Sequence, residues 1–394
     1  MKKHISNAYW QEHVLAGLME QVYCLKICLF NRYDPNSIFG GIETYVLYLA
    51  RYFTEWGHEV TISYPTRRMK KSIRPVRWAV WKLLRMNLSE IYDSFQIASD
   101  ITKVEADIYH GQGQHPFGFS VLRSIGMGSR KPFVSTAHGS KYALARALRS
   151  CCSIHDQIIT LNMERFVFNH SDKVICVSNA VKQELMEGYK TGSDNLTVIH
   201  NGVDPDLYTS SKAKHSYVVT FFLKGGIRKG VDVAAKILTR LMSGSIMSDN
   251  SVTVQAITDR TPANWLLDLT RNKSLKLYQN PDEAMFRNLL STSDVFIFPT
   301  PAEGHSVLLV EAMAAGNAVL ASDIEPNKET IEHGISGYLF DRIDIDRWIA
   351  CLMDLYENGK RLREIQDNAL KRVRNKFHSE MMCKQTLAIY ESLL

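Results

Sequence analysis

Residues 294–322 follow a strand, loop, helix, strand order that few folds accommodate. Residues 294–299 and 318–322 are apolar runs of strand length, and Gly316 is typical of the end of a helix. Two such strands joined through a helix build a parallel sheet. The sequence therefore predicts an α/β protein around this unit.

Two carboxylates, Glu303 and Glu311, flank the start of the expected helix, for which Ser306 is a good N-cap. A helix N-terminus offers unpaired N–H groups that suit a diphosphate. At about 1.5 Å per residue, Glu311 would lie roughly 7 Å along the helix, where a carboxylate can accept hydrogen bonds from the two hydroxyls of a ribose. The pair alone leaves a second interpretation open, in which Glu303 favours the helix dipole and Glu311 is solvated.

The sequence around this pair is more specific than the pair itself. Glu303, seven further residues and Glu311 are followed by Ala-Met-Ala-x-Gly, and in this the chain resembles the family 4 glycosyltransferases. The resemblance covers nearly the whole chain. It implies that Glu303 contacts the transferred sugar, that Glu311 contacts the ribose, and that the loop between them binds the donor. The loop residues are Gly304, His305, Ser306 and Val307, with His305 where the family commonly has Phe and Ser306 where it has Gly.

The resemblance also implies a GT-B architecture, in which two Rossmann-like domains face a central cleft. The first convincing strand is 24–30, so residues 1–22 form an extension. We expect a first domain at 23–204, a polar linker at 205–216, and a second domain at 217–376. The segment 377–394 resembles the family's closing helix, which crosses back to the first domain. A chain of 394 residues with 45% hydrophobic residues fits two domains of this size.

A glycine pair, Gly40 and Gly41, precedes a helical pattern and a strand at 57–62. Paired glycines allow a ligand to approach the backbone closely, although a bare pair is also typical of an ordinary tight turn. The family has the same Gly-Gly-x-Glu element facing its cleft, which favours a donor-binding loop. The pattern differs from the Gly-x-Gly-x-x-Gly fingerprint, and this argues against a dehydrogenase.

A second glycine-rich loop follows the apolar run 218–223. It contains three glycines and three cations, so it suits a phosphate, although a solvated basic turn has the same composition. The family loop begins Gly-Arg and ends Lys-Gly; here the end matches, whereas Leu223-Lys224 replaces the beginning. Lysine keeps the charge and loses the bidentate fork. The residues implied for the diphosphate are Lys224, Gly225, Arg228 and Lys229.

Two histidines, His110 and His138, end strand-like runs at 106–110 and 131–138. Histidines at such places line sites and also serve as hydrogen-bonded structural residues. The second resembles the family's active-site histidine between donor sugar and acceptor, so we select His138. Further on, Ser178 has the position of a helix cap.

Eight Lys and Arg residues lie between 61 and 89 without an acidic residue, in a helical pattern with two tryptophans. Residues 67–88 therefore suit an anionic membrane surface. An equal alternative is an amphipathic helix packed on its domain with solvated cations. Nucleic acid is a weaker competitor because no recognised binding fold accompanies the charge.

The seven cysteines are scattered without metal-type spacing, which predicts a reducing compartment and no zinc site. We expect no metal or other cofactor, because Lys224, Lys229 and the helix N-terminus near Ser306 can stabilise the leaving diphosphate. Charged residues interrupt any signal-peptide core near the start, and no apolar run of about 20 residues could span a membrane. We expect a cytoplasmic protein that can lie on the inner face of the cytoplasmic membrane.

The resemblance, taken with these features, implies a retaining glycosyltransferase of hexosyl or N-acetylhexosaminyl type. The donor would be a nucleotide-diphosphate sugar and the acceptor a glycan or lipid-linked glycan of cell-surface polysaccharide or glycolipid synthesis. A non-catalytic nucleotide- or glycan-binding relative of the same fold is the alternative, because the phosphate loop departs from the family pattern. A sugar-nucleotide epimerase is disfavoured by the Gly-Gly-x-Glu element and the terminal segment.

Overall fold

The computed structural model describes residues 24–36, 40–65, 89–147, 154–208, 216–244, 251–258, 264–269 and 274–394. Within these residues the chain forms two sheets of six strands each, in which all neighbouring strands are parallel. The first sheet has the order β2 (Glu59–Ser63), β1 (Lys26–Phe30), β3 (Ile108–Gln112), β4 (Phe133–Ala137), β5 (Lys173–Cys176) and β6 (Leu196–Val198). The second has the order β12 (Tyr338–Phe340), β11 (Ala318–Ser322), β10 (Val295–Phe298), β7 (Tyr217–Leu223), β8 (Val252–Thr258) and β9 (Leu275–Gln279).

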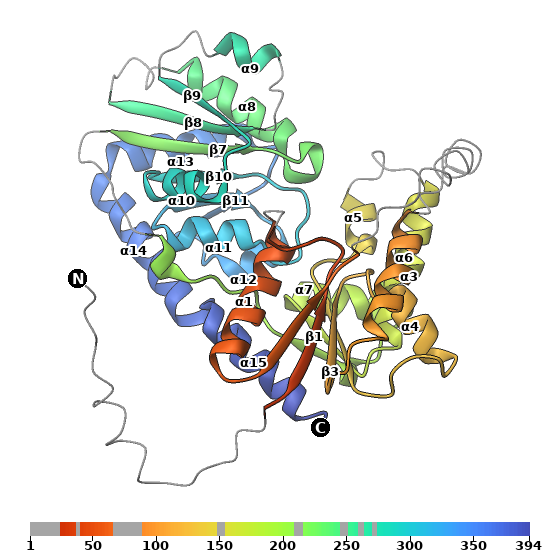
Figure 1. Ribbon diagram of the computed structural model, residues 1–394. Helices are drawn as coiled ribbons and strands as arrows, with labels where there is room; N and C mark the ends of the chain where they lie inside the picture. The colour runs from red at the N-terminus through yellow and green to blue at the C-terminus, as the bar shows by residue number, and fades with distance from the viewer. Residues whose placement is uncertain are drawn as a thin grey trace, which may run out of the picture.

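Helices alternate with these strands, and Figure 1 shows the two sheets in separate lobes. The lobe of the first sheet, called the first domain below, contains α1 (Gly41–Glu55), α3 (Ser89–Ile101), α4 (Phe117–Ser124), α5 (Lys141–Ala147), α6 (Ile154–Asn169) and α7 (Asn179–Glu184). The lobe of the second sheet, called the second domain, contains α8 (Val231–Met242), α9 (Asn264–Leu269), α10 (Glu283–Ser291), α11 (Val307–Ala314), α12 (Glu325–Thr330), α13 (Ile345–Glu357) and α14 (Gly359–Lys376). The last helix, α15 (Ser379–Glu391), lies beside α1 (Figure 1). The predicted α/β class with two Rossmann-like domains is confirmed.

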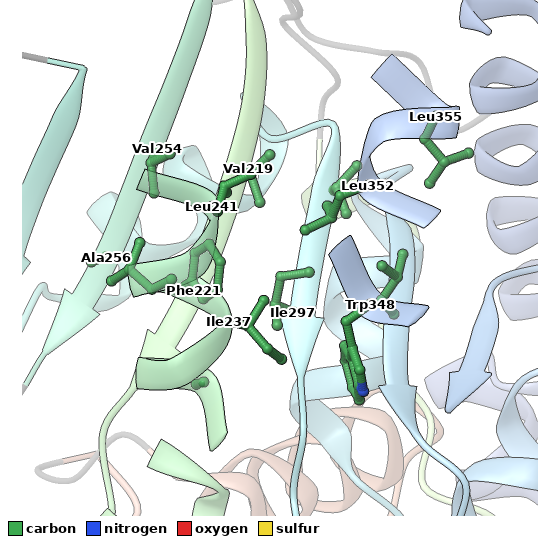
Figure 2. Packing of buried hydrophobic residues seen from close by; sticks show 14 of the residues in the cluster. Val219, Phe221, Ile237, Leu241, Val254, Ala256, Ile297, Trp348, Leu352 and Leu355 are labelled. Carbon is green, nitrogen blue, oxygen red and sulfur yellow. The ribbon is translucent and has the colours of Figure 1, made fainter. Parts of the chain in front are cut away.

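Both faces of each sheet are covered, which is why the strands are almost continuously apolar. In the second domain, Figure 2 shows Phe221 of β7 and Ile297 of β10 packed near Ile237 of α8 and Trp348 of α13. All four side chains are fully buried. Burial of this kind stabilises a core by about 25 cal/mol per Å² of apolar surface, so the sheet provides a rigid base for the loops at its edge.

In each sheet the order in which successive strands are added reverses once, at a topological switch point. Ligands of open α/β sheets bind at the carboxyl ends of the strands at such a point. In the first sheet the change lies between β1 and β3, so the loop containing Gly40 and Gly41 follows the switch-point strand. In the second it lies between β7 and β10, whose following loops contain residues 224–230 and 299–306. The topology therefore brings the sequence-predicted loops to the two switch points.

The closing helix α15 packs on the first domain. Tyr390 and Met382 are buried with Phe53 of α1, and the Tyr390 hydroxyl lies 2.5 Å from Nδ1 of His110. At the junction, Gly202 packs against the backbone of His378, where a Cβ would lie 2.7 Å from the carbonyl oxygen. This close approach explains the glycine.

One carboxylate, Glu329 of α12, joins the second domain to the first. It accepts hydrogen bonds from the backbone N–H groups of Asn179 and Ala180 at the start of α7, 2.9 Å each, and from the Asn179 side chain. His200 Nε2 lies 2.9 Å from the same carboxylate. Although burial opposes its charge, these hydrogen bonds lower the pKa of Glu329 to about 2. The carboxylate is therefore ionised across the physiological range.

Two sequence predictions lie wholly outside the described residues, namely the extension 1–22 and the basic stretch 67–88. None of the described helices is long and apolar enough to cross a membrane. Five cysteines fall within the described residues, and all five are free thiols.

Candidate active site

A cavity of about 540 Å³ lies between the two domains, at the carboxyl ends of both sheets. Residues of the first domain contribute the Gly-Gly loop and His138, and the second domain contributes both glycine-rich loops and the start of α11. Every site residue predicted from the sequence except Gly304 lines this cavity: Gly40, Gly41, His138, Lys224, Gly225, Arg228, Lys229, Glu303, His305, Ser306, Val307 and Glu311. Gly304 lines a neighbouring cavity.

Two helices begin at this cavity from opposite domains. Ser306 is the N-cap of α11, and its hydroxyl accepts from the N–H of Leu309, as the sequence predicts. Across the cavity, α1 begins at Gly41, where a Cβ would lie 3.4 Å from the side chain of Val307. Helix N-termini present unpaired N–H groups and positive dipole ends, so the two starts favour an anion between them.

The loop after β7 brings its cations to the same place. It forms a 3₁₀ turn, Gly226–Lys229, that ends at Gly230 with φ of 75°, and a Cβ there would lie 2.0 Å from the carbonyl oxygen of Pro299. Only glycine allows the two loops of the second domain to pack this closely. Lys224 and Lys229 thereby reach the cavity together with Arg228, and Nζ of Lys224 also donates to Asn280, 2.9 Å away.

Lys229, predicted at the diphosphate, and Glu303, predicted at the transferred sugar, are in direct contact. Lys229 Nζ lies 2.6 Å from Glu303 Oε1, which also accepts from the hydroxyl of Thr300 at 3.2 Å. The Lys229 side chain is 22% exposed and that of Glu303 12%, so the pair is largely shielded from water. Charge-assisted hydrogen bonds of this kind fix both side chains. The pair presents a carboxylate and an ammonium group at one wall of the cavity.

Glu311 lies on the cavity side of α11 and is 6% exposed. Burial raises its pKa to about 7, against the effect of a hydrogen bond to Oε1 from the hydroxyl of Tyr208, 3.0 Å away. Sequence reasoning missed Tyr208, because it falls within the segment interpreted as a polar linker. The available signal was its position directly after the junction between the domains, where an aromatic residue can reach the second domain.

His138 follows β4 at the edge of the cavity. Its Nε2 lies 2.8 Å from Oε1 of Gln112, and the ring of Tyr45 packs edge-on with the centroids 5.0 Å apart. Burial of the ring by the surrounding protein lowers the pKa of His138 to about 3, so the imidazole is neutral at physiological pH. Gln112 was also missed, since β3 continues two residues beyond the histidine at which the sequence ended it.

His110, the histidine that was not selected, has a structural environment. It is fully buried inside β3, with Nε2 2.7 Å from the hydroxyl of Thr136 and Nδ1 against Tyr390 of α15. Both ring nitrogens therefore have protein partners. Burial lowers the pKa of His110 to about 3, and His138 adds to this effect.

His305 lines the cavity, and its ring packs against two other rings at the junction of the domains. The ring centroid lies 5.0 Å from that of His200 and 5.2 Å from that of Phe377. Burial, followed by the neighbouring His200, lowers the pKa of His305 to about 3. A neutral ring packed among rings explains how His305 can occupy a position where the family commonly has Phe. The hydrogen bond from Asn201 Nδ2 to the His305 carbonyl, 2.8 Å, holds the loop in place.

A second cavity of about 180 Å³ adjoins the first on the side of the first domain. The two share Ile42, His138, Arg228 and Glu303. Gly304 closes its second-domain wall and packs against the backbone of His138, where a Cβ would lie 2.2 Å from the carbonyl oxygen. The Ser178 hydroxyl donates to the Gly304 carbonyl at 2.7 Å and also caps α7. Two compartments thus meet at His138 and Glu303.

A large cleft between two Rossmann-like domains, with a smaller compartment at its side, is the architecture of GT-B glycosyltransferases. Comparison with known families agrees in both domains. Residues 39–207 match the model of Glycosyltransferase Family 4, and residues 260–372 match that of Glycosyl transferases group 1. The chain belongs to the family 4 glycosyltransferases.

Individual relatives cover almost the whole chain. An uncharacterized glycosyltransferase of Methanocaldococcus jannaschii is 25% identical over 93% of this chain and 98% of its own. The phosphatidyl-myo-inositol mannosyltransferase of Mycolicibacterium smegmatis is 25% identical over 90% of both chains. The crystal structure of Anabaena HepE in complex with UDP-glucose superposes with a TM-score of 0.69 at 17% identity, over 94% of this chain and all of that one.

Among the described residues, no three side chains of His, Cys, Asp or Glu are grouped so that they could hold a metal ion together. Independence from metals stays a prediction.

Proposed function

We propose that this chain is a retaining glycosyltransferase that moves a sugar from a nucleotide-diphosphate sugar to a glycan or lipid-linked acceptor. One observation carries the proposal: a single cavity between the domains brings together three cations, two helix N-termini and three carboxylates, among them Glu303 and Glu311. Each group matches one part of such a donor. The diphosphate would lie between Lys224, Lys229 and the N-terminus of α11, the ribose at Glu311, and the sugar at Glu303 and His138.

The remaining wall of the cavity suits a nucleobase. Phe222, Ile257, Pro281 and Phe286 line it and present apolar surface, and the rings of Phe222 and Phe286 pack edge-on. Bases stack on such surfaces through their π faces. Anabaena HepE, which has the same fold, has been crystallised with UDP-glucose, so UDP is the first nucleotide to test.

In the proposed reaction the bond between the sugar C1 and the diphosphate oxygen breaks, and a bond from C1 to the acceptor oxygen forms on the same face. The acceptor proton passes to the departing diphosphate. Negative charge therefore develops on the diphosphate, where Lys224 and Lys229 lie, and fixed positive charge at that place is the main catalytic contribution of the protein. The acceptor would enter through the second cavity, which meets the donor cavity at His138 and Glu303.

The acceptor class follows from two lines of support. The M. smegmatis relative is a phosphatidyl-myo-inositol mannosyltransferase, and an Escherichia coli relative, 22% identical over 55% of this chain and 59% of its own, is a galactosyltransferase acting on a diphosphoundecaprenol-linked sugar. Independently, residues 67–88 carry a cationic sequence suited to an anionic leaflet. We propose a cytoplasmic enzyme that acts on a membrane-proximal acceptor.

The test is a donor screen across UDP-, GDP- and ADP-sugars, which measures binding and sugar release, followed by determination of the product anomer by NMR. One donor is expected to be bound and turned over, with the anomeric configuration retained. Inversion would refute the retaining mechanism. Tight nucleotide binding without turnover toward any acceptor would favour the non-catalytic relative.

A further inference from the structure

Tyr208 occupies an unusual place for a residue of the connection between the domains. The preceding residues form a 3₁₀ turn, Pro205–Leu207, which Asp204 caps through Asp206 N–H. This turn directs the Tyr208 ring into the core of the second domain, where it is 7% exposed. The connection therefore delivers a side chain to Glu311, a residue that lines the donor cavity.

The Tyr208 hydroxyl donates to Oε1 of Glu311 at 3.0 Å, and it is the one described side chain with a hydrogen bond to this carboxylate. Burial, followed by the charge of Glu311, raises the pKa of Tyr208 far above its usual value. The phenol thus stays protonated and donates. A carboxylate offers about four acceptor positions, so the bond to Tyr208 leaves others for a pair of ligand hydroxyls.

We propose that Tyr208 is a positioning residue for ribose recognition: its hydroxyl holds Glu311 in the orientation and charge state that accept the two ribose hydroxyls of the donor. This inference rests on the proposed function. Phenylalanine at position 208 would fill the same space without the hydroxyl, so the contribution of the hydroxyl can be tested directly.

The inference has a signature in pH that a packing role alone would lack. Three charged or titratable groups besides Tyr208 face Glu311: Arg287 and Glu283 of α10, and Tyr48 of α1. Burial raises the Glu311 pKa to about 7, the Tyr208 hydrogen bond and Arg287 lower it, and Glu283 raises it. Loss of the Tyr208 hydroxyl moves the carboxyl pKa further upward, so a larger share of Glu311 is protonated at neutral pH.

The experiment measures binding of UDP, GDP and ADP by calorimetry from pH 5.5 to 8.5 in the parent and in Tyr208→Phe. The nucleotide bound most tightly by the parent is then compared with its 2′,3′-dideoxy form. Affinity of Tyr208→Phe should fall by about tenfold at pH 7, the effect of one hydrogen bond to a charged group. The pH midpoint of binding should move upward, and the variant should discriminate less against the dideoxy nucleotide.

Tyr217→Phe is the matched control, since it removes another buried tyrosine hydroxyl of the second domain, bonded to the Leu352 carbonyl at 3.1 Å. It should leave affinity and pH midpoint unchanged. In a Glu311→Gln background, Tyr208→Phe should have no further effect on the pH midpoint. If Tyr208→Phe keeps the parent's nucleotide affinity, pH midpoint and discrimination against the dideoxy nucleotide, the role of Tyr208 is overturned while the proposed function stands. A parent that binds no nucleotide would overturn the proposed function itself.

Discussion

Gly304 is a point of close approach between the two domains, and its replacement by alanine tests whether their separation controls catalysis. A Cβ at this position would lie 2.2 Å from the carbonyl oxygen of His138 and 2.9 Å from Cα of Gly139. Side-chain Cβ atoms essentially never approach closer than 3.0 Å, so the two loops must move apart by about 0.8 Å. Both neighbours are backbone atoms, which cannot rotate away.

This displacement separates His138 from Glu303, between which the sugar would be transferred. A misplacement of about 1 Å costs on the order of a hundredfold in rate, so Gly304→Ala should lower kcat by about that factor. Glu311, Lys224 and Lys229 belong to the second domain alone. Nucleotide affinity should therefore stay within about threefold of the parent.

The assay combines steady-state turnover of the donor identified in the screen with calorimetric nucleotide binding. Gly192→Ala is the matched control, because a Cβ there meets no atom within 4 Å and the backbone has φ of −64°. This control should keep the parental kcat. A kcat of Gly304→Ala within threefold of the parent would refute the link between domain separation and catalysis, and a parallel loss of nucleotide affinity would show that the second domain itself is damaged.

Three further outcomes are expected. Lys229→Ala should lower kcat by about a hundredfold because a cation at the departing diphosphate is lost. A chelator should leave the activity of the parent unchanged. Unchanged turnover in the variant, or inactivation of the parent by the chelator, would contradict this mechanism. Glu329→Gln should lower the melting temperature at pH 7, because the ionised Glu329 carboxylate stabilises the folded state. The difference from the parent should shrink as the pH falls from about 4.5 toward 2, where Glu329 becomes protonated. A difference in melting temperature that does not depend on pH would refute this. Residues 67–88 should bind anionic but not neutral vesicles in the whole protein at low salt, and serine at positions 67, 68, 70 and 71 should abolish co-sedimentation; equal sedimentation in all conditions would leave the stretch as a solvated surface.

The fold and the second-domain half of the site could be predicted because their signals are local. Ser306 and Gly316 delimit a helix through chemistry confined to its own ends, and the spacing between Glu303 and Glu311 lies within one strand, loop and helix unit. Parallel topology then determines which edge of the sheet the loops occupy. The site follows from these elements without knowledge of any distant contact.

The residues that sequence reasoning missed act over long separations. Tyr208 meets Glu311 across 103 positions, and Glu329 meets Asn179 across 150. No periodicity or cap pattern encodes such a pair, since each partner satisfies its own local pattern without the other. Gln112 was missed for a different reason: strand boundaries are the least certain part of a sequence prediction, and two residues decided whether it faced the site.

The attachment of Glu329 to main-chain amides has an evolutionary consequence. Two of its donors are the peptide N–H groups of residues 179 and 180, which every amino acid except proline supplies. The amino-acid types at the start of α7 can therefore drift without loss of this contact. Descendants of one ancestral chain could thus keep the pairing of their two domains while loop sequences diverge toward new acceptors.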